Sequence, residues 1–190
     1  MAVLYLAGPD VFLPQAREIG ALKQQLCAGA GHEGLYPLDE DESVFGDPRA
    51  IFKANCALMD KADAGLFNLS PFRGPAADSG TVFELGYMAA RGKGLIAYTA
   101  AQRPYADRVA EGFGPFIRNQ GLPWDRDGLM VEDFGLMDNL MLTEAIAKNG
   151  GLFLTPQDVM PEDASAGPAP DLAAWPVFRA ALRRLPEILG

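Results

Sequence analysis

Two carboxylates stand six positions apart in a stretch of small and apolar residues, PAADSGTVFELGYMAARGKG, at residues 75–94. Asp78 ends a loop and Glu84 lies in the first turn of the helix predicted after it, so both side chains can face one rim. Asp10 and Tyr5, from the first predicted strand and the loop after it, can reach the same rim. Carboxylates that converge with a tyrosine, without histidine, favour acid–base and nucleophilic chemistry on a glycosidic bond.

The simplest alternative for Glu84 is a structural one. Thr81-x-x-Glu84 has the spacing of a capping box, in which the glutamate satisfies a backbone N–H at the start of a helix. This pattern alone does not distinguish a helix cap from a catalytic carboxylate, and both interpretations stay open on spacing alone.

Several other chemistries lack the residues that they need. His32 is the only histidine, so a multi-histidine metal site is excluded and a catalytic triad would have one base to use. GAGHEG matches a dinucleotide fingerprint through its glycines, but it follows a predicted helix and precedes a strand, which is the reverse of the required order. We therefore expect no metal and no cofactor.

The elements that must position these residues alternate between strand and helix. This alternation predicts an α/β fold of the doubly wound, flavodoxin/Rossmann-like kind, with a five-stranded parallel sheet and helices on both faces. Ligands bind to such sheets outside the carboxyl ends of the strands, where GPDVF, PLDEDESVFGD and SPFRGPAADSG follow three of the predicted strands. The strands are predicted at 3–8, 34–39, 64–70, 95–99 and 151–155, and the helices at 14–31, 47–63, 81–92 and 138–149.

The chain divides into a catalytic domain and a short C-terminal part. Residues 1–155 carry the alternating pattern, whereas 156–176 hold five prolines without periodicity and are typical of an extended connector. An apolar face in FRAALRRLPEIL predicts a last helix that packs on the same domain or on a neighbouring subunit. We treat 156–190 as this connector and helix.

Composition narrows the class of partner. A formal net charge of -9 makes nucleic acid polymers and anionic membranes improbable partners. The two cysteines give no disulfide framework, and the first residues read as a strand rather than a signal peptide. We expect a cytoplasmic protein that binds a small ligand.

Three blocks of the sequence, YLAGPDVF, ADAGLFNLSPFRGPAADSGTVFELGYMAARGK and EDFGLMDNLML, resemble the nucleoside 2-deoxyribosyltransferase family. They occur in the family's order, and the resemblance covers roughly residues 3–155. The acid-x5-Glu-Leu-Gly-Tyr block and the late Asn-Leu-Met block are specific in combination, whereas each is weak alone.

The resemblance implies a role for each matching residue. Glu84 would be the nucleophile, and Tyr5 would hold its carboxylate in position. Asp78 and Asp63 match acids near the base and the sugar. Gly8 matches the small residue that lets the nucleoside approach the end of the first strand.

The resemblance also implies a shared active site. Asn139 and Met141 match residues that reach into the site of a neighbouring subunit, so we expect a homodimer or a higher homo-oligomer. Asp10 stands where the family often has a neutral or aromatic residue, which leaves the base preference open.

Structural alternatives remain beside these roles. An aromatic stack on the base is open to Phe12, Phe45 and Phe72, although core packing would explain each equally well. Four other residues have ordinary alternatives: a turn cap for Asp63, a strand position for Tyr5, a helix N-terminus for Asn139 and the core for Met141.

The implied function is transfer of a 2-deoxyribosyl group between nucleobases. Its partners would be 2′-deoxyribonucleosides and free nucleobases, and the reaction would be a retaining double displacement through a covalent ester on Glu84. One alternative is hydrolysis of the N-glycosidic bond of nucleosides or nucleotides. An alternative of another class is a non-catalytic nucleotide sensor on the same kind of sheet.

Overall fold

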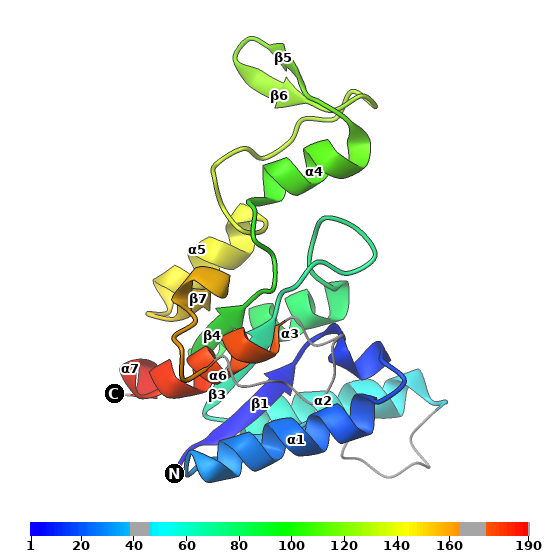
Figure 1. Ribbon diagram of the computed structural model, residues 1–190. Helices are drawn as coiled ribbons and strands as arrows, with labels where there is room; N and C mark the ends of the chain where they lie inside the picture. The colour runs from blue at the N-terminus through cyan, green and yellow to red at the C-terminus, as the bar shows by residue number, and fades with distance from the viewer. Residues whose placement is uncertain (39–45, 164–173, 190) are drawn as a thin grey trace.

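A parallel five-stranded sheet forms the centre of the molecule, in the order β2-β1-β3-β4-β7 (Figure 1). The computed structural model describes residues 1–38, 46–163 and 174–189. The predicted doubly wound α/β architecture is confirmed, with strands that are shorter than expected at β2 and β7. The strands are β1 (Val3–Ala7), β2 (Glu33–Leu35), β3 (Ala64–Asn68), β4 (Gly94–Tyr98) and β7 (Leu152–Leu154).

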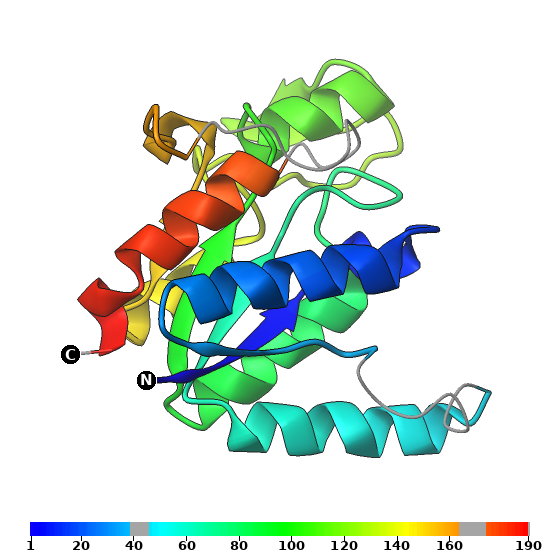
Figure 2. The same ribbon diagram turned by 60° about the horizontal axis from the view of Figure 1, so that its bottom comes forward.

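Helices cover both faces of this sheet, because successive side chains of a strand point to opposite faces. Leu4 and Leu6 of β1 pack in one core cluster with α1 and α6, whereas Tyr5 and Ala7 pack in the other with α2, α3 and α5. Figure 2 shows α1 and α6 together on one side of the sheet. The helices are α1 (Ala16–Gly29), α2 (Pro48–Lys61), α3 (Ser79–Ala90), α4 (Tyr105–Phe113), α5 (Leu140–Lys148), α6 (Trp175–Arg184) and α7 (Pro186–Leu189).

Helix α3 begins at Ser79, two residues before the predicted start, because Asp78 is its N-cap. The Asp78 carboxylate accepts hydrogen bonds from the backbone N–H of Thr81 at 2.9 Å and from its hydroxyl at 3.1 Å. Thr81 is therefore the capped residue and not the cap. The capping-box interpretation of Glu84 is wrong, because the carboxylate of Glu84 lies one turn further along the helix and bonds elsewhere.

The segment between β4 and α5 holds elements that the sequence patterns did not predict. After α4 the chain forms an antiparallel hairpin of β5 (Ile117–Asn119) and β6 (Leu122–Trp124), which projects from the body in Figure 1. Its two-residue turn has positive φ at both Gln120 (52°) and Gly121 (83°), as tight hairpin turns require. Strands of three residues are too short to show a period of two.

The C-terminal part returns to the sheet. Helix α6 packs on the face that α1 also covers, with Val177, Phe178 and Ala181 buried against it. Of the predicted connector, the described residues 156–163 include a short 3-10 turn at Pro156–Asp158, and the rest up to 173 lies outside the described residues. Within the described ranges, no helix is long and apolar enough to span a membrane.

Candidate active site

A cavity of about 360 Å³ opens at the carboxyl end of β1, between α2 and the start of α3. It has an apolar side and a smaller polar side, which is the usual composition of a small-molecule site. Its position agrees with the rule that such sheets bind ligands beyond the carboxyl ends of their strands. The cavity is lined by Gly8, Val11, Phe12, Pro37, Leu38, Ile51, Ala54, Asn55, Asp78, Gly80, Thr81 and Glu84.

Tyr5 and Glu84 form a hydrogen bond at the base of this cavity. The Tyr5 hydroxyl donates to Oε1 of Glu84 at 2.7 Å. Tyr5 is fully buried on the face of β1 that α3 covers, and Glu84 lies on the side of α3 that faces the cavity. Burial, and then the charge of Glu84, raise the pKa of Tyr5, so its hydroxyl stays protonated and remains a donor.

The environment of Glu84 brings its titration close to neutral pH. Burial raises the pKa of Glu84 from its ordinary value of 4.5 to about 7. The hydrogen bond from Tyr5 acts in the opposite direction and stabilises the carboxylate, while the negative charge of Asp78 raises the pKa further. A partly desolvated carboxylate that is substantially ionised at neutral pH is suited to attack an electrophilic carbon.

Asp78 is both the N-cap of α3 and a residue that lines the cavity. Its carboxylate caps α3 through Thr81, and it also lines the cavity beside Glu84. The structure therefore brings together the three residues that the sequence suggested as catalytic, Tyr5, Asp78 and Glu84. Their chemical roles stay predictions.

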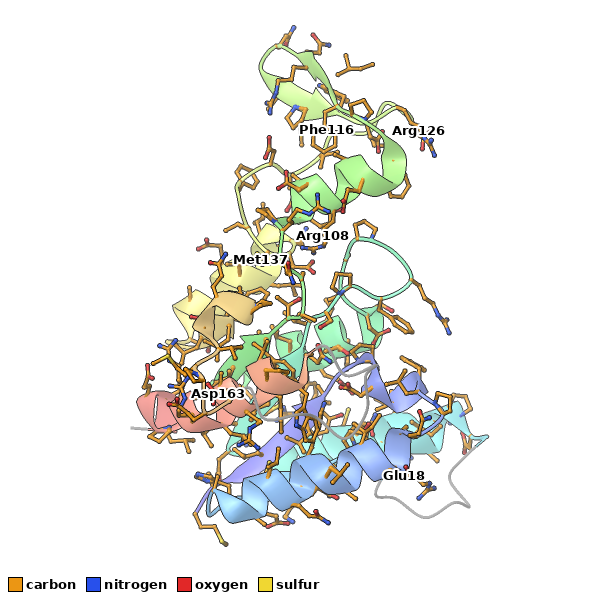
Figure 3. The ribbon with its side chains drawn as sticks, in the orientation of Figure 1. Glu18, Arg108, Phe116, Arg126, Met137 and Asp163 are labelled. Carbon is orange, nitrogen blue, oxygen red and sulfur yellow. The ribbon has the colours of Figure 1, made fainter. Side chains whose placement is uncertain are left out.

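The loop that delivers Asp78 is held in place by Arg108 of α4. Its guanidinium donates to the backbone carbonyls of Pro75 at 2.9 Å and of Met137 at 2.8 Å (Figure 3). Asp138, 3.5 Å from that guanidinium, accepts from the backbone N–H of Ala77 at 3.1 Å. Sequence patterns do not indicate these contacts, because they join residues 29 to 61 positions apart.

Gly8 lies where no other residue fits. A Cβ atom at this position would be 2.6 Å from Cβ of Asn68 and 2.8 Å from Oδ2 of Asp10. Gly8 also lines the cavity, but the added Cβ would point toward Asn68 and Asp10, on the side away from the cavity. The role that the resemblance implies for Gly8 stays a prediction.

An aromatic pair stands at the edge of the cavity. Phe12 lines the cavity, is 56% exposed, and stacks on Phe72 with ring centroids 5.0 Å apart and planes at 17°. The guanidinium of Arg73 lies 4.8 Å from the centroid of Phe72, on the same stack. An exposed aromatic face of this kind can receive a nucleobase. Phe45 lies outside the described residues.

Asp10 does not face the cavity, which corrects the expectation that it reaches the same rim as Glu84. It is 5% exposed and points to the opposite face of the sheet. There its Oδ2 lies 2.6 Å from Nζ of Lys23, and both of its oxygens accept from Asn68. A contact with a nucleobase would require Asp10 to leave this buried ion pair.

Asp63 lies at the edge of the sheet opposite the cavity, and the role that the resemblance implies for it stays a prediction. It precedes β3, whereas the cavity lies beyond the carboxyl end of the neighbouring strand. Its Oδ2 accepts from the backbone N–H of Val3 at 2.8 Å, and its own N–H donates to the carbonyl of Val3 at 2.8 Å. Asp63 therefore joins the starts of β1 and β3, as the turn-cap alternative expects.

Asn139 and Met141 lie at the start of α5, and neither is among the residues that line the cavity. Asn139 is the N-cap of α5, where its Oδ1 accepts from the backbone N–H of Met141 at 2.9 Å. Its Nδ2 donates to Glu132 at 2.9 Å. Met141 is 69% exposed, so it is not a core residue in a single chain.

Asn55 of α2 is the cavity residue that the sequence interpretation missed. Its Oδ1 is buried and has no hydrogen-bond partner among the described residues. A buried carbonyl oxygen without a partner is uncommon, and at a cavity wall it indicates where a ligand donor would bind. Its spacing from Ile51, one helical turn earlier, places both on one face, but a polar residue on such a face gives no functional signal by itself.

Together these side chains provide a buried carboxylate with a raised pKa, a phenol hydrogen-bonded to it, a second carboxylate and a largely apolar cavity. Such a set can stabilise positive charge on a sugar carbon and form an ester with it. Among the residues that the structure describes, no three His, Cys, Asp or Glu side chains group as metal ligands would.

The chain is similar in sequence to a known family and to several known proteins. A family model described as nucleoside 2-deoxyribosyltransferase matches residues 4–141. The uncharacterized protein C191.05c of Schizosaccharomyces pombe is 37% identical over 165 residues, covering 78% of this chain and 78% of that protein.

Two solved structures have related sequences. The 2-desoxiribosyltransferase from Leishmania mexicana has 35% sequence identity and a TM-score of 0.59, over 75% of this chain and 85% of that chain. The 2-deoxyribosyltransferase from Bacillus psychrosaccharolyticus has 25% identity and a TM-score of 0.43, over 53% of this chain and 74% of that chain. Because the family model matches most of the chain and the Leishmania mexicana enzyme is 35% identical over 75% of it, the chain belongs to the nucleoside 2-deoxyribosyltransferase family.

Proposed function

We propose that this protein transfers the 2-deoxyribosyl group of a 2′-deoxyribonucleoside from one nucleobase to another. The observation that carries the proposal is the 2.7 Å hydrogen bond between Tyr5 and Glu84 at the base of an apolar cavity. It fixes one carboxylate oxygen and leaves the other oxygen of Glu84 available to a ligand. Asp78, on the same wall, supports the assignment.

The reaction proceeds in two displacements. A carboxylate oxygen of Glu84 forms a bond to C1′ while the C1′–N bond breaks, and the departing base keeps the electron pair and takes up one proton. A ring nitrogen of the second base then attacks C1′ from the original face, loses one proton, and the ester bond to Glu84 breaks. Two inversions give net retention, and the proton count balances over the exchange.

The nearest rival is hydrolysis, which shares the first displacement. If water instead of a base attacks the ester, the product is free deoxyribose and the protein is an N-glycoside hydrolase. The two activities therefore differ in what enters the cavity second, and not in the role of Glu84. A sensor would bind a nucleoside without breaking the C1′–N bond.

One incubation separates these functions. The protein is mixed with 2′-deoxyinosine, with and without adenine, and the products are separated by chromatography. We expect 2′-deoxyadenosine and hypoxanthine when adenine is present. Release of free deoxyribose at the same rate in both samples would indicate a hydrolase, and no product despite binding would indicate a sensor.

Replacement of Glu84 tests the covalent step. Glu84→Ala should lose activity by at least about three orders of magnitude, as expected for removal of a nucleophile. Glu144→Ala, an exposed position on α5, is the matched control and should keep parental activity. Activity of Glu84→Ala within tenfold of the parent would refute the assignment.

A further inference from the structure

The turn at Gly8–Phe12, which follows β1, has two sides. Gly8, Val11 and Phe12 line the cavity and form one of its walls. Asp10, in the middle of the turn, points away from the cavity and is buried between the sheet and α1. Whatever holds Asp10 therefore also sets the position of that wall.

Lys23 of α1 is the main partner of Asp10. Its Nζ lies 2.6 Å from Oδ2 of Asp10, and the two side chains are 3% and 6% exposed. The same Nζ donates to the hydroxyl of Tyr98 at 3.0 Å and lies 5.2 Å from the centroid of the Phe178 ring. The ammonium is thus enclosed by one carboxylate, one hydroxyl and one aromatic face, with little access to water.

A second chain of hydrogen bonds links Asp10 to the ends of two further strands. Nδ2 of Asn68, the last residue of β3, donates to Oδ2 of Asp10 at 3.2 Å. Oδ1 of Asn68 accepts from the backbone N–H of Ser70 at 3.1 Å and from its hydroxyl at 2.6 Å. The Ser70 hydroxyl oxygen accepts from the N–H of Ala100, just beyond β4, at 2.9 Å. The turn is therefore tied to the carboxyl ends of β3 and β4.

The C-terminal helix closes this network from outside. Ala174, Trp175 and Phe178 cover Asp10, Lys23 and Tyr98, and the space left between them is only about 10 Å³. That volume is about the limit for a single water molecule and is too small for a metabolite. The network is thus a close-packed part of the core and not a second ligand site.

Stability alone gives a weak reason for such a pair. Replacement of both partners of a buried ion pair by neutral side chains of similar volume is often neutral or stabilising, whereas loss of one partner leaves a buried charge unpaired. A buried pair is better explained by the single conformation that it specifies. Here that conformation is the one in which the Gly8–Phe12 turn forms the cavity wall.

We propose that Lys23 is a positioning residue, which holds the Gly8–Phe12 turn through Asp10 so that Gly8, Val11 and Phe12 form the substrate wall. Its expected effect on nucleoside binding rests on the proposed function. The part of the proposal that concerns the position of the turn is independent of the proposed function. Helix α6 lies outside residues 4–141, the segment that the family model matches. It is part of the same network because its residues enclose the Lys23 ammonium.

The test uses a double variant, Lys23→Met/Asp10→Asn, because Lys23→Met alone would leave the Asp10 carboxylate buried without its cation. Methionine keeps the length of the lysine stem, and the asparagine amide can still accept from Asn68. Amide hydrogen exchange of peptides that cover residues 8–13 reports the turn directly. KM and kcat are measured with 2′-deoxyinosine as donor and adenine as acceptor.

We expect exchange in the 8–13 segment to rise about tenfold or more, while segments of β3 and α3 keep parental protection. KM for 2′-deoxyinosine should rise about tenfold with kcat within about threefold, since a wall that binds substrate and transition state alike changes KM. The proposal would be overturned if the double variant has the melting temperature, the exchange rates at residues 8–13 and the KM of the parent, because the ion pair would then be dispensable.

The remaining outcomes are also decisive. Faster exchange with parental KM would overturn the link between the turn and the substrate. If the parent itself exchanges no bases, the proposed function fails, but the exchange measurement still decides whether Lys23 holds the turn. The matched control is Lys61→Met, which breaks an ion pair of 2.7 Å with Glu33 whose side chains are 55% and 43% exposed. This control should change neither exchange at residues 8–13 nor KM.

Discussion

The phenol of Tyr5 and the carboxylate of Glu84, 79 positions apart in the chain, are joined by a hydrogen bond of 2.7 Å. Tyr5 lies on β1, and Glu84 lies on α3, the helix that follows the neighbouring strand β3. The parallel pairing of β1 and β3 therefore brings the two side chains together. It also opposes the desolvation that raises the pKa of Glu84 to about 7. The reactivity of Glu84 therefore depends on its neighbours in a way that can be measured.

The pH dependence of activity should move in opposite directions in two variants. Because the nucleophile must be ionised, we expect kcat/KM of the parent to fall below about pH 7, where Glu84 becomes protonated. Tyr5→Phe removes the bond that stabilises the carboxylate, so this acidic limb should move to higher pH. Asp78→Asn removes the neighbouring negative charge, so the limb should move to lower pH.

Both variants are chosen to preserve the fold. Asparagine caps helices about as well as aspartate, so Asp78→Asn should keep the bond to the N–H of Thr81. Tyr87→Phe, on another side of α3, is the control for loss of a phenol and should leave the limb at its parental pH. Shifts of Tyr5→Phe and Asp78→Asn in the same direction would contradict the assignment of the limb to Glu84.

The buried carboxylate of Glu84 should reduce the stability of the folded protein at neutral and alkaline pH. A pKa raised from 4.5 to about 7 means that the folded state binds the proton more tightly, so stability falls as pH rises through this window. Glu84→Gln carries no such charge and should be more stable than the parent at pH 8, by at most about 3 kcal/mol. Denaturant unfolding at pH 8 and at pH 4 measures the difference.

The predicted gain in stability of Glu84→Gln depends on pH, and this dependence distinguishes it from an ordinary effect on packing. The advantage of Glu84→Gln should disappear at pH 4, where Glu84 of the parent is protonated in both the folded and the unfolded states. Glu144→Gln on the exposed side of α5 should show no such pH-dependent gain. A Glu84→Gln protein that is less stable than the parent at pH 8 would mean that the charged form is favoured by the fold.

Asn55 should contribute to ligand binding and not to folding. Its buried Oδ1 lacks a partner among the described residues, and a buried polar atom of this kind costs about 1–3 kcal/mol. Asn55→Leu should therefore keep or raise the melting temperature. Binding of 2′-deoxyadenosine, measured by calorimetry in a Glu84→Gln background, should weaken about tenfold or more. Unchanged binding together with a lower melting temperature would assign Asn55 to the fold alone.

The convergence of the central residues was predictable because it follows from local rules. A tyrosine on a strand of period two, an aspartate at the end of a loop and a glutamate in the first turns of the next helix must approach the carboxyl edge of a parallel sheet. What spacing did not reveal was the partner of Glu84. Thr81 and Glu84 match a capping box, but in the fold Asp78 is the cap and Glu84 bonds to Tyr5, so this match is accidental.

Asp10 shows what a sequence pattern cannot decide. Its place after β1 puts it at the correct edge, but the turn directs its side chain to the other face, toward Lys23. The one available signal was Lys23 itself, which lies four residues after Ile19 and four before Cys27, on the apolar face of α1. A lysine on such a face needs a buried partner, but the sequence does not say which acid provides it.

Asp63 lies away from the cavity for a different reason. Its position before β3 already puts it at the amino edge of the sheet, away from a site at the carboxyl edge. Asp63 does not line the cavity, so the role that the resemblance implies for it stays a prediction. Asn55, on a helix that the sequence predicted well, lies at the cavity instead.

The last prediction concerns a site shared between subunits. Asn139 and Met141 do not line the cavity of their own chain, although the resemblance gives them a role at a site. Met141 is 69% exposed, and the segment between α4 and α5 has further exposed apolar residues, such as Ile117 of β5 at 66% and Leu129 at 65%. We expect these surfaces to meet a second copy of the chain, with a dimer as the smallest active unit.

Mixing two inactive variants tests this arrangement. Asn139→Ser is preferred to alanine because serine keeps the N-cap of α5, and Glu84→Ala supplies the complementary defect. If a site takes Glu84 from one subunit and Asn139 from its neighbour, a mixed dimer holds one intact site and one with both defects. Subunit exchange should then restore up to about half of the parental activity per mixed dimer. A fully active monomer by light scattering, or no recovery after demonstrated exchange, would reject the shared site and leave the role of Glu84 intact.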